Sequence, residues 1–198
     1  MALSSKVGTF TTNTVTGNQA ITGVGFQPKI VFIFATQKTA AGASVDMSLC
    51  FGVGVSSTSR AYKAVADRDA QTTTEANTRS SNAGLFAIKT TSSPTVLTAA
   101  ADLVTLDSDG FTFNLTTAPG TGIFMGYLAL GGTDIANVAT GVFNERTGTG
   151  SQAVTGVGFQ PDAILLFHSF SEADLPTDSG DGSLQIGFGE SSTKRATV

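Results

Sequence analysis

The sequence predicts an all-β protein made of tandem antiparallel β-sandwich domains of jelly-roll type, and three observations support this fold class. Charged residues make up only 13% of the 198 positions, about half the usual share, whereas Gly contributes 23 residues and Phe 14. Several runs alternate apolar and polar residues with the period of two that half-buried strands show. Turn signals such as Asp109-Gly110 separate these runs. Together they indicate about eight strands in a complete domain and no amphipathic helix.

The elements of the first third of the chain are extended. Residues 7–12 alternate in polarity and precede a Gly17-Asn18 turn signal. Pro28 favours an extended backbone at the preceding residue, and the apolar run 29–36 then predicts a strand buried on both faces. Residues 47–55 form the next predicted strand, where Gly52 and Gly54 share one face. Two glycines on one face predict that another backbone approaches closely there.

The middle of the chain begins with a polar stretch. Residues 63–82 are rich in Thr, Ala and Asp, which predicts a long surface loop, with a short helix as the alternative. A loop of that length suits contact with a neighbouring subunit or a receptor. The later predicted strands, separated by Asp109-Gly110 and Ala118-Pro119-Gly120, are residues 84–90, 102–106, 111–115 and 123–130.

The chain contains an internal duplication. Residues 16–28 recur as residues 149–161, an offset of 133, with only Asn18/Ser151 and Ile21/Val154 different. The match then continues with an offset of 135 as far as about Lys63. We therefore predict two domains, a first repeat over residues 1–137 and a second, partial repeat over residues 138–198.

The second repeat has no counterpart of residues 101–130. Three explanations are open, in this order: the chain is a fragment, another subunit completes the unit, or the partial unit packs on the first repeat. An unpaired sheet edge in the partial unit is expected to accept a strand from an adjacent chain. Without such cover, the edge would favour aggregation.

Composition argues against several classes of function. The net charge of −4 does not favour nucleic acid or an anionic membrane as a partner. One Cys excludes an internal disulfide framework and a cysteine-based metal cluster, and a single His with no Trp leaves few catalytic groups. No apolar run is long enough to cross a membrane as a helix, and the start resembles no secretory signal. We expect a protein without enzymatic activity that is made in a cytoplasm and stays there, or leaves it as part of something larger.

Two motifs have both a chemical and a structural interpretation. Residues 23–28 superficially resemble a phosphate loop, but Pro28 supplies no N–H group and no helix follows, so a tight turn is the better interpretation. His168, with Ser169 and Glu172 nearby in sequence, is a formal candidate for a catalytic triad. Its counterpart in the first repeat is Ala35, so we interpret it as a polar strand end or interface residue.

Three further candidates complete the search. Cys50 is expected to be a small buried side chain. Asp107 and Asp109 have a spacing that a glycosidase pair can also have, but two carboxylates around an Asp-Gly turn are ordinary. The acidic loop 171–182 contains four carboxylates that suit Ca²⁺, although its spacing fits no known calcium loop. The sequence therefore assigns no catalytic, cofactor-binding or metal-binding residue.

The repeated motif Thr-Gly-Val-Gly-Phe-Gln-Pro at residues 22–28 and 155–161, with residues 107–114 and 127–132, resembles virion structural proteins of tailed bacteriophages. The resemblance implies a non-enzymatic virion protein, first of all an external capsid decoration protein that stabilises the shell through subunit contacts. Its partners would be the major capsid protein or tail proteins and further copies of itself. The alternative is a tail or fibre module that binds host surface glycans.

Overall fold

The computed structural model describes residues 2–40, 42, 46–68, 76–89, 96–168, 177–179, 184–191 and 193–197. Within these ranges the chain forms strands and turns and contains no helix, and every strand pair is antiparallel. The predicted all-β antiparallel class is confirmed.

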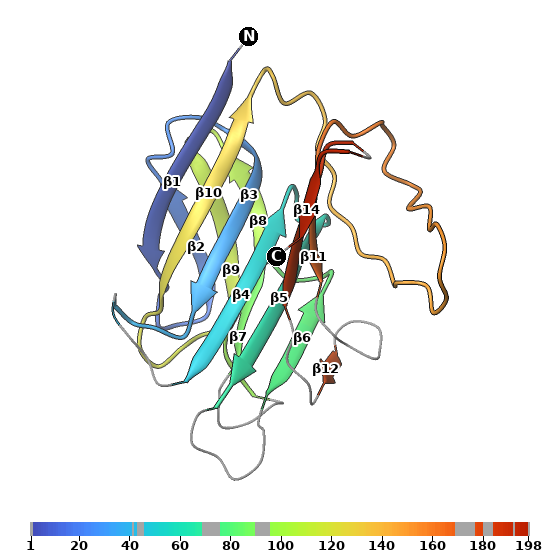
Figure 1. The fold of residues 1–198 in the computed structure, drawn as a ribbon. Coiled ribbons are helices and arrows are strands. Elements are labelled where there is room, and N and C mark those ends of the chain that lie inside the picture. Colours follow the sequence, from blue (N-terminus) through green and yellow to red (C-terminus); the bar gives the residue numbers. More distant parts are fainter. Residues whose placement is uncertain are drawn as a thin grey trace.

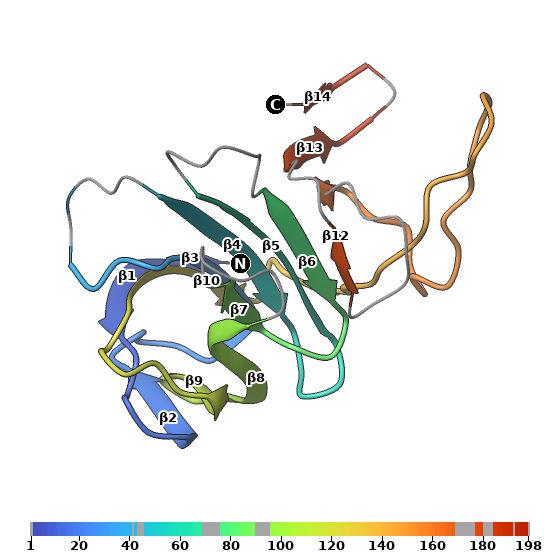
Figure 2. The ribbon, with the colours of Figure 1, turned by 90° about the horizontal axis from the view of Figure 1, so that it is seen from below.

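Two sheets contain the strands of the first repeat (Figure 1). The large sheet has the order β1-β10-β3-β4-β5-β6-β12, and its first six strands are β1 (Leu3–Thr11), β10 (Phe124–Gly132), β3 (Pro28–Thr36), β4 (Met47–Gly54), β5 (Arg60–Asp67) and β6 (Asn77–Ser81). The small sheet has the order β2 (Gly17–Thr22), β9 (Gly110–Thr117), β8 (Leu97–Asp107) and β7 (Phe86–Lys89). The two sheets face each other as a β-sandwich (Figure 2).

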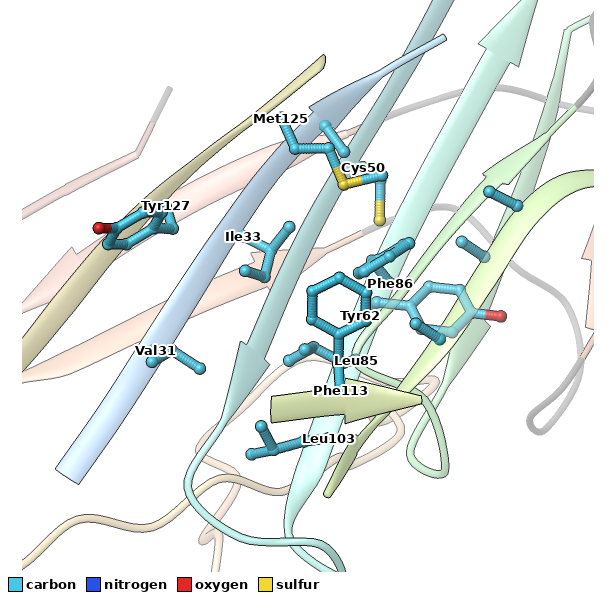
Figure 3. Close-up of a cluster of buried hydrophobic side chains, with 14 of the residues drawn as sticks. Val31, Ile33, Cys50, Tyr62, Leu85, Phe86, Leu103, Phe113, Met125 and Tyr127 are labelled. Carbon is cyan, nitrogen blue, oxygen red and sulfur yellow. The ribbon is translucent and has the colours of Figure 1, made fainter. Parts of the chain in front are cut away.

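The core lies between these two sheets. Alternate residues of β3 point inward, so that Val31 and Ile33 are fully buried, and they meet Phe86 of β7, Leu103 of β8 and Phe113 of β9 (Figure 3). Rings pack closely in this layer, with the centroids of Phe86 and Phe113 5.5 Å apart in an edge-on arrangement. Because these side chains come from both sheets, burial of their apolar area holds the sheets together.

The prediction for residues 63–82 was wrong. Strand β5 runs to Asp67 and β6 begins at Asn77, so that only residues 69–75 of this stretch lie outside the described residues. The buried positions of these strands hold small or polar side chains, among them Ala64 on the inner face and Thr78 and Ser80 on the outer face. Such residues carry a weak hydrophobic signal, so the stretch had the composition of a loop although its strands are buried. These strands also explain why the first repeat has ten strands rather than about eight.

The jelly-roll and tandem-sandwich parts of the prediction are not confirmed. Strands β1 and β10 pair, as do β2 and β9, in the nested order that a jelly roll requires. Strands β3 to β6, however, are joined as successive neighbours in one sheet, and β7 to β9 in the other. The rest of the sandwich is therefore two facing meanders.

The second repeat contributes a third sheet of three strands, β11 (Ile164–His168), β13 (Gln185–Gly189) and β14 (Arg195–Thr197). By sequence these match parts of β3, β4 and β5, and they lie in the same order. The short strand β12 (Thr177–Ser179) instead pairs with β6 and extends the large sheet. Residues 135–163 form no strand.

The third sheet lies on the outer side of the large sheet, away from the small sheet (Figure 2). Phe167 of β11 stacks on Phe51 of β4, with ring centroids 5.3 Å apart and the planes inclined by 26°. Phe34 of β3 meets Phe51 edge-on at 5.5 Å and extends this aromatic contact. The third sheet therefore packs on the first repeat through the face that carries Phe167, and its other face carries Leu166.

Candidate assembly surface

A glycine loop between β2 and β3 binds a carboxylate in the first repeat. The backbone N–H of Gly23 donates to Oδ2 of Asp109 at 3.1 Å, and that of Gly25 donates to Oδ1 at 2.5 Å. Between them, the N–H of Val24 donates to the backbone carbonyl of Asp109 at 3.2 Å. Both glycines have positive φ, +81° and +87°, which turns the successive N–H groups toward one acceptor. The loop is a tight turn, as predicted, and it also joins the two sheets.

The same loop recurs in the second repeat. Gly156 and Gly158 have φ values of +86° and +84°, within a few degrees of their counterparts Gly23 and Gly25. Residues 138–198 contain no counterpart of Asp109, because the match to the first repeat ends near Lys63. The loop conformation therefore occurs twice in the described residues, and a carboxylate is bound to it in the first repeat.

The face of the third sheet that corresponds to the sandwich core is exposed. Ile164 and Leu166 are 48% and 45% exposed, whereas their counterparts Val31 and Ile33 are 0% exposed. Phe188 on the neighbouring strand is 52% exposed, but it pairs with Leu165 and therefore lies on the opposite face of the sheet. A groove of about 490 Å³ runs over this face, lined by residues of β11, β13 and β14. Apolar side chains of this size, exposed together, indicate a contact surface.

The glycines of β4 and β13 show how closely other segments approach this face in the first and in the second repeat. In the first repeat, a Cβ on Gly52 would lie 1.9 Å from the carbonyl oxygen of Leu85, and one on Gly54 would lie 2.7 Å from Leu103. The predicted close approach of another backbone is therefore confirmed. At the matching positions, Gly187 has no neighbour nearer than 3.6 Å and Gly189 has none within 4 Å. Among the described residues, nothing lies over Gly187 and Gly189 as closely as Leu85 and Leu103 lie over Gly52 and Gly54.

The catalytic candidates occupy structural positions. Asp107 accepts hydrogen bonds from the hydroxyls of Thr105 and Thr112 at 2.6 and 2.7 Å, while Asp109 is bound by the glycine loop. His168 Nε2 lies 3.8 Å from Oε2 of Glu145, a neighbour that sequence reasoning did not identify. Ser169 and Glu172 lie outside the described residues.

Cys50 is a fully buried residue of β4, as predicted. Burial raises the pKa of its thiol to about 12, although a hydrogen bond with the backbone of Ala87 lowers it slightly. A thiol with this pKa is protonated at neutral pH and unreactive. Burial also raises the pKa of Tyr127, and the negative charge of Asp109 raises it further.

The predicted calcium loop at residues 171–182 lies outside the described residues except for 177–179, which form β12. Across the rest of the described chain, no three His, Cys, Asp or Glu side chains are grouped so that they would hold a metal ion. The same residues include no helix of the length and hydropathy needed to cross a membrane.

A second, polar pocket of about 270 Å³ opens at the edge of the sandwich between β6 and β8. In its wall Arg79 Nε donates to the hydroxyl of Tyr62 at 3.1 Å, and Arg60 lies 3.7 Å from Asp102. Tyr62 itself is only 6% exposed. Its ring is therefore part of the wall and presents no free face to a ligand.

A scan against protein-family models found no match, and neither did searches of curated proteins and of solved structures. The candidate assembly surface consists of the loop 156–158 and the exposed face of the third sheet.

Proposed function

We propose that this protein is a non-enzymatic structural protein of a tailed-bacteriophage virion, with external decoration of the capsid as its role. One observation carries the proposal: the candidate assembly surface exposes side chains whose counterparts are fully buried in the first repeat. An exposed apolar face that ends in a row of backbone N–H donors suits contact with another protein. The repeated motif resembles virion proteins, so we place these contacts within a virus particle.

Mechanically, the first repeat serves as a rigid module. Its two sheets are joined through a dense core of buried side chains, and the hydrogen bonds from the loop 23–25 to Asp109 fix the β2–β3 connection to the β8–β9 turn. Contacts made by many copies on a capsid lattice add together, so each contact can be weak while the shell is strongly reinforced. The other virion proteins, above all the major capsid protein, and copies of this chain are the proposed partners.

Receptor binding through host glycans is less well supported. Sugar rings stack on exposed aromatic faces, but the chain has no Trp, and its two tyrosines, Tyr62 and Tyr127, are 6% and 5% exposed. Exposed rings belong to phenylalanines, and Phe188 lies in the groove described above.

The copy number per particle tests the proposal. Quantitative mass spectrometry of purified virions should find this protein at a copy number close to that of the major capsid protein. A matched pair of variants sharpens the test: Leu166→Asp should reduce incorporation, whereas Val7→Asp, at an exposed position on the edge strand β1, should not. A count far below that of the capsid protein would move the protein to the tail, and its absence from virions would overturn the proposal.

A further inference from the structure

We propose that residues 156–160 form a second binding site for an aspartyl residue, which they hold through its side-chain carboxylate and its main-chain carbonyl. The inference rests on the proposed function for its use in assembly, because it names the chemical group that the candidate assembly surface recognises. An aspartyl residue of this polypeptide and one of another chain present the same chemistry, and the experiment below distinguishes these two sources.

The first argument is the way in which the first repeat binds Asp109. The N–H groups of Gly23 and Gly25 each donate to one oxygen of the carboxylate, and the N–H of Val24 between them donates to the main-chain carbonyl of the same residue. Successive N–H groups in this conformation form a concave site for an anion. The loop therefore holds one aspartyl residue by three hydrogen bonds, of which two reach the carboxylate.

A fourth donor makes this recognition depend on the turn that carries the aspartate. Nε2 of Gln27 donates at 2.8 Å to the carbonyl oxygen of Leu106, which precedes Asp109 by three residues. The loop thus binds two main-chain carbonyls in addition to the carboxylate. A free anion such as inorganic phosphate has no counterpart of these carbonyls, so the four donors together fit an aspartate in a peptide turn.

The second argument is that the second repeat keeps all four donors in the same local conformation. Residues 156–160 have the same sequence as residues 23–27, and the φ values of Gly156 and Gly158 match those of their counterparts. None of the described residues accepts a hydrogen bond from these four donors. The binding conformation therefore forms without a bound carboxylate, and a loop that is already in its bound form loses little entropy on binding.

The third argument is access to the loop. Gly156, Gly158 and Gln160 are exposed. A Cβ added to either glycine would meet no atom within 4 Å, so a peptide turn has room to approach. For the same reason, an alanine at Gly158 changes the backbone preference without causing a steric clash, which makes this substitution a clean test of the positive φ.

The test adds a cyclised hairpin peptide with the sequence of residues 103–114 to the full 198-residue protein, labelled for nuclear magnetic resonance. The backbone amide signals of residues 156–158 and the side-chain amide of Gln160 should shift until they saturate. The signals of residues 23–27 should not move, because Asp109 already occupies that loop. A peptide with Asp109→Asn should bind about tenfold more weakly, because the charge-assisted hydrogen bonds are lost.

Two glycine variants of the protein provide a matched pair. Gly158→Ala should weaken binding of the peptide about tenfold, because a side chain disfavours the positive φ that directs the N–H groups. Gly148→Ala should leave binding unchanged, because Gly148 is exposed in the same connection and its φ is not positive.

Hydrogen exchange in the protein alone identifies the source of the aspartate. If the amides of Gly156 and Gly158 exchange as slowly as those of Gly23 and Gly25 before any peptide is added, and Gly158→Ala removes this protection, the same polypeptide supplies the carboxylate. If they become slow only with the peptide, the carboxylate comes from another chain.

Three results would overturn the inference: fast exchange at the loop both with and without the peptide, equal binding of the Asp109→Asn peptide, or equal shifts with inorganic phosphate. Because the assay uses purified components, it can fail while the copy number in virions still supports the proposed function, and the reverse is also possible.

Discussion

Residues 17–22 and 150–155 have nearly the same sequence and different structures. Four of the six residues are identical, and Ile21 is replaced by Val154. The first segment is strand β2, paired along its length with β9, whereas the second forms no strand. The second repeat contains no counterpart of β9. The difference shows that a strand exists only where a partner satisfies its backbone hydrogen bonds, whatever its propensity.

Local structure, in contrast, is the same in both repeats. The side chain of Gln19 accepts from the N–H of Asn13 and donates to the carbonyl of Thr11, each at 2.8 Å. Gln152 makes the matching pair of bonds, to Arg146 and Asn144, at 2.9 and 2.7 Å. These contacts span at most eight residues, so they form without the missing half of the unit.

The largest expected difference in stability is between the inner face of the large sheet and the matching face of the third sheet. Ile33→Ala should lower the free energy of unfolding by about 2–5 kcal/mol, because it opens a cavity in a fully buried layer. Leu166→Ala, at the matching position, should change it by less than about 0.5 kcal/mol, because the side chain is exposed. Urea unfolding followed by circular dichroism measures both. Equal losses would mean that the face of the third sheet is covered in solution.

The next comparison is between Cys50 and its counterpart Gln185 at alkaline pH. The thiol ionises near its ordinary pKa of 9.0 in the unfolded chain and at about 12 when folded, so the stability it contributes is complete below pH 9 and is lost between pH 9 and 12. The slope should approach about 1.4 kcal/mol per pH unit. Cys50→Ala should remove this part of the decline, and Gln185→Ala should not. The free energy of unfolding of both variants, measured at several alkaline pH values, tests this expectation. If it falls equally with pH in both variants, the thiol is not buried.

Glycine substitutions give a smaller contrast. Gly52→Ala should cost about 1–3 kcal/mol, because its Cβ meets a backbone oxygen that cannot move aside. Gly187→Ala should be neutral or raise stability by up to about 0.5 kcal/mol, because the site has room and Ala is favoured over Gly in a strand. Thermal unfolding of the pair provides the measurement. A destabilising Gly187→Ala would reveal that a backbone lies over β13.

The smallest expected difference concerns the two glycine loops. Gly25→Ala should lower stability by about 1–2 kcal/mol, because a side chain disfavours positive φ and the bond to Asp109 holds the loop in place. Gly158→Ala should cost less than about 0.5 kcal/mol in the protein alone, since nothing in the described chain holds that loop to a carboxylate. The same denaturation series measures this difference.

Sequence reasoning found most of the period-two strands, the Asp109-Gly110 turn and the duplication, because each depends on residues close together in the chain. The turn predicted at Gly17-Asn18 was wrong, because both residues belong to strand β2 and pair with β9. The same reasoning did not find β5 or β6, and in β6 the buried residues Asn77, Thr78 and Ser80 are polar. Nor did it find the partners of the glycine loop, because Asp109 lies 84 residues beyond Gly25. The incomplete second repeat could be read from the sequence, whereas the exposure of Ile164 and Leu166 could not.

The sequence by itself determines the all-β class, the positive-φ turns and the short side-chain bridges, because interactions between near neighbours decide them in both repeats alike. The tertiary structure decides which extended segments become strands and which apolar faces become core. The physical reason is that pairing and burial need a partner from elsewhere in the chain, and the first repeat has its β7 to β10 where the second has none.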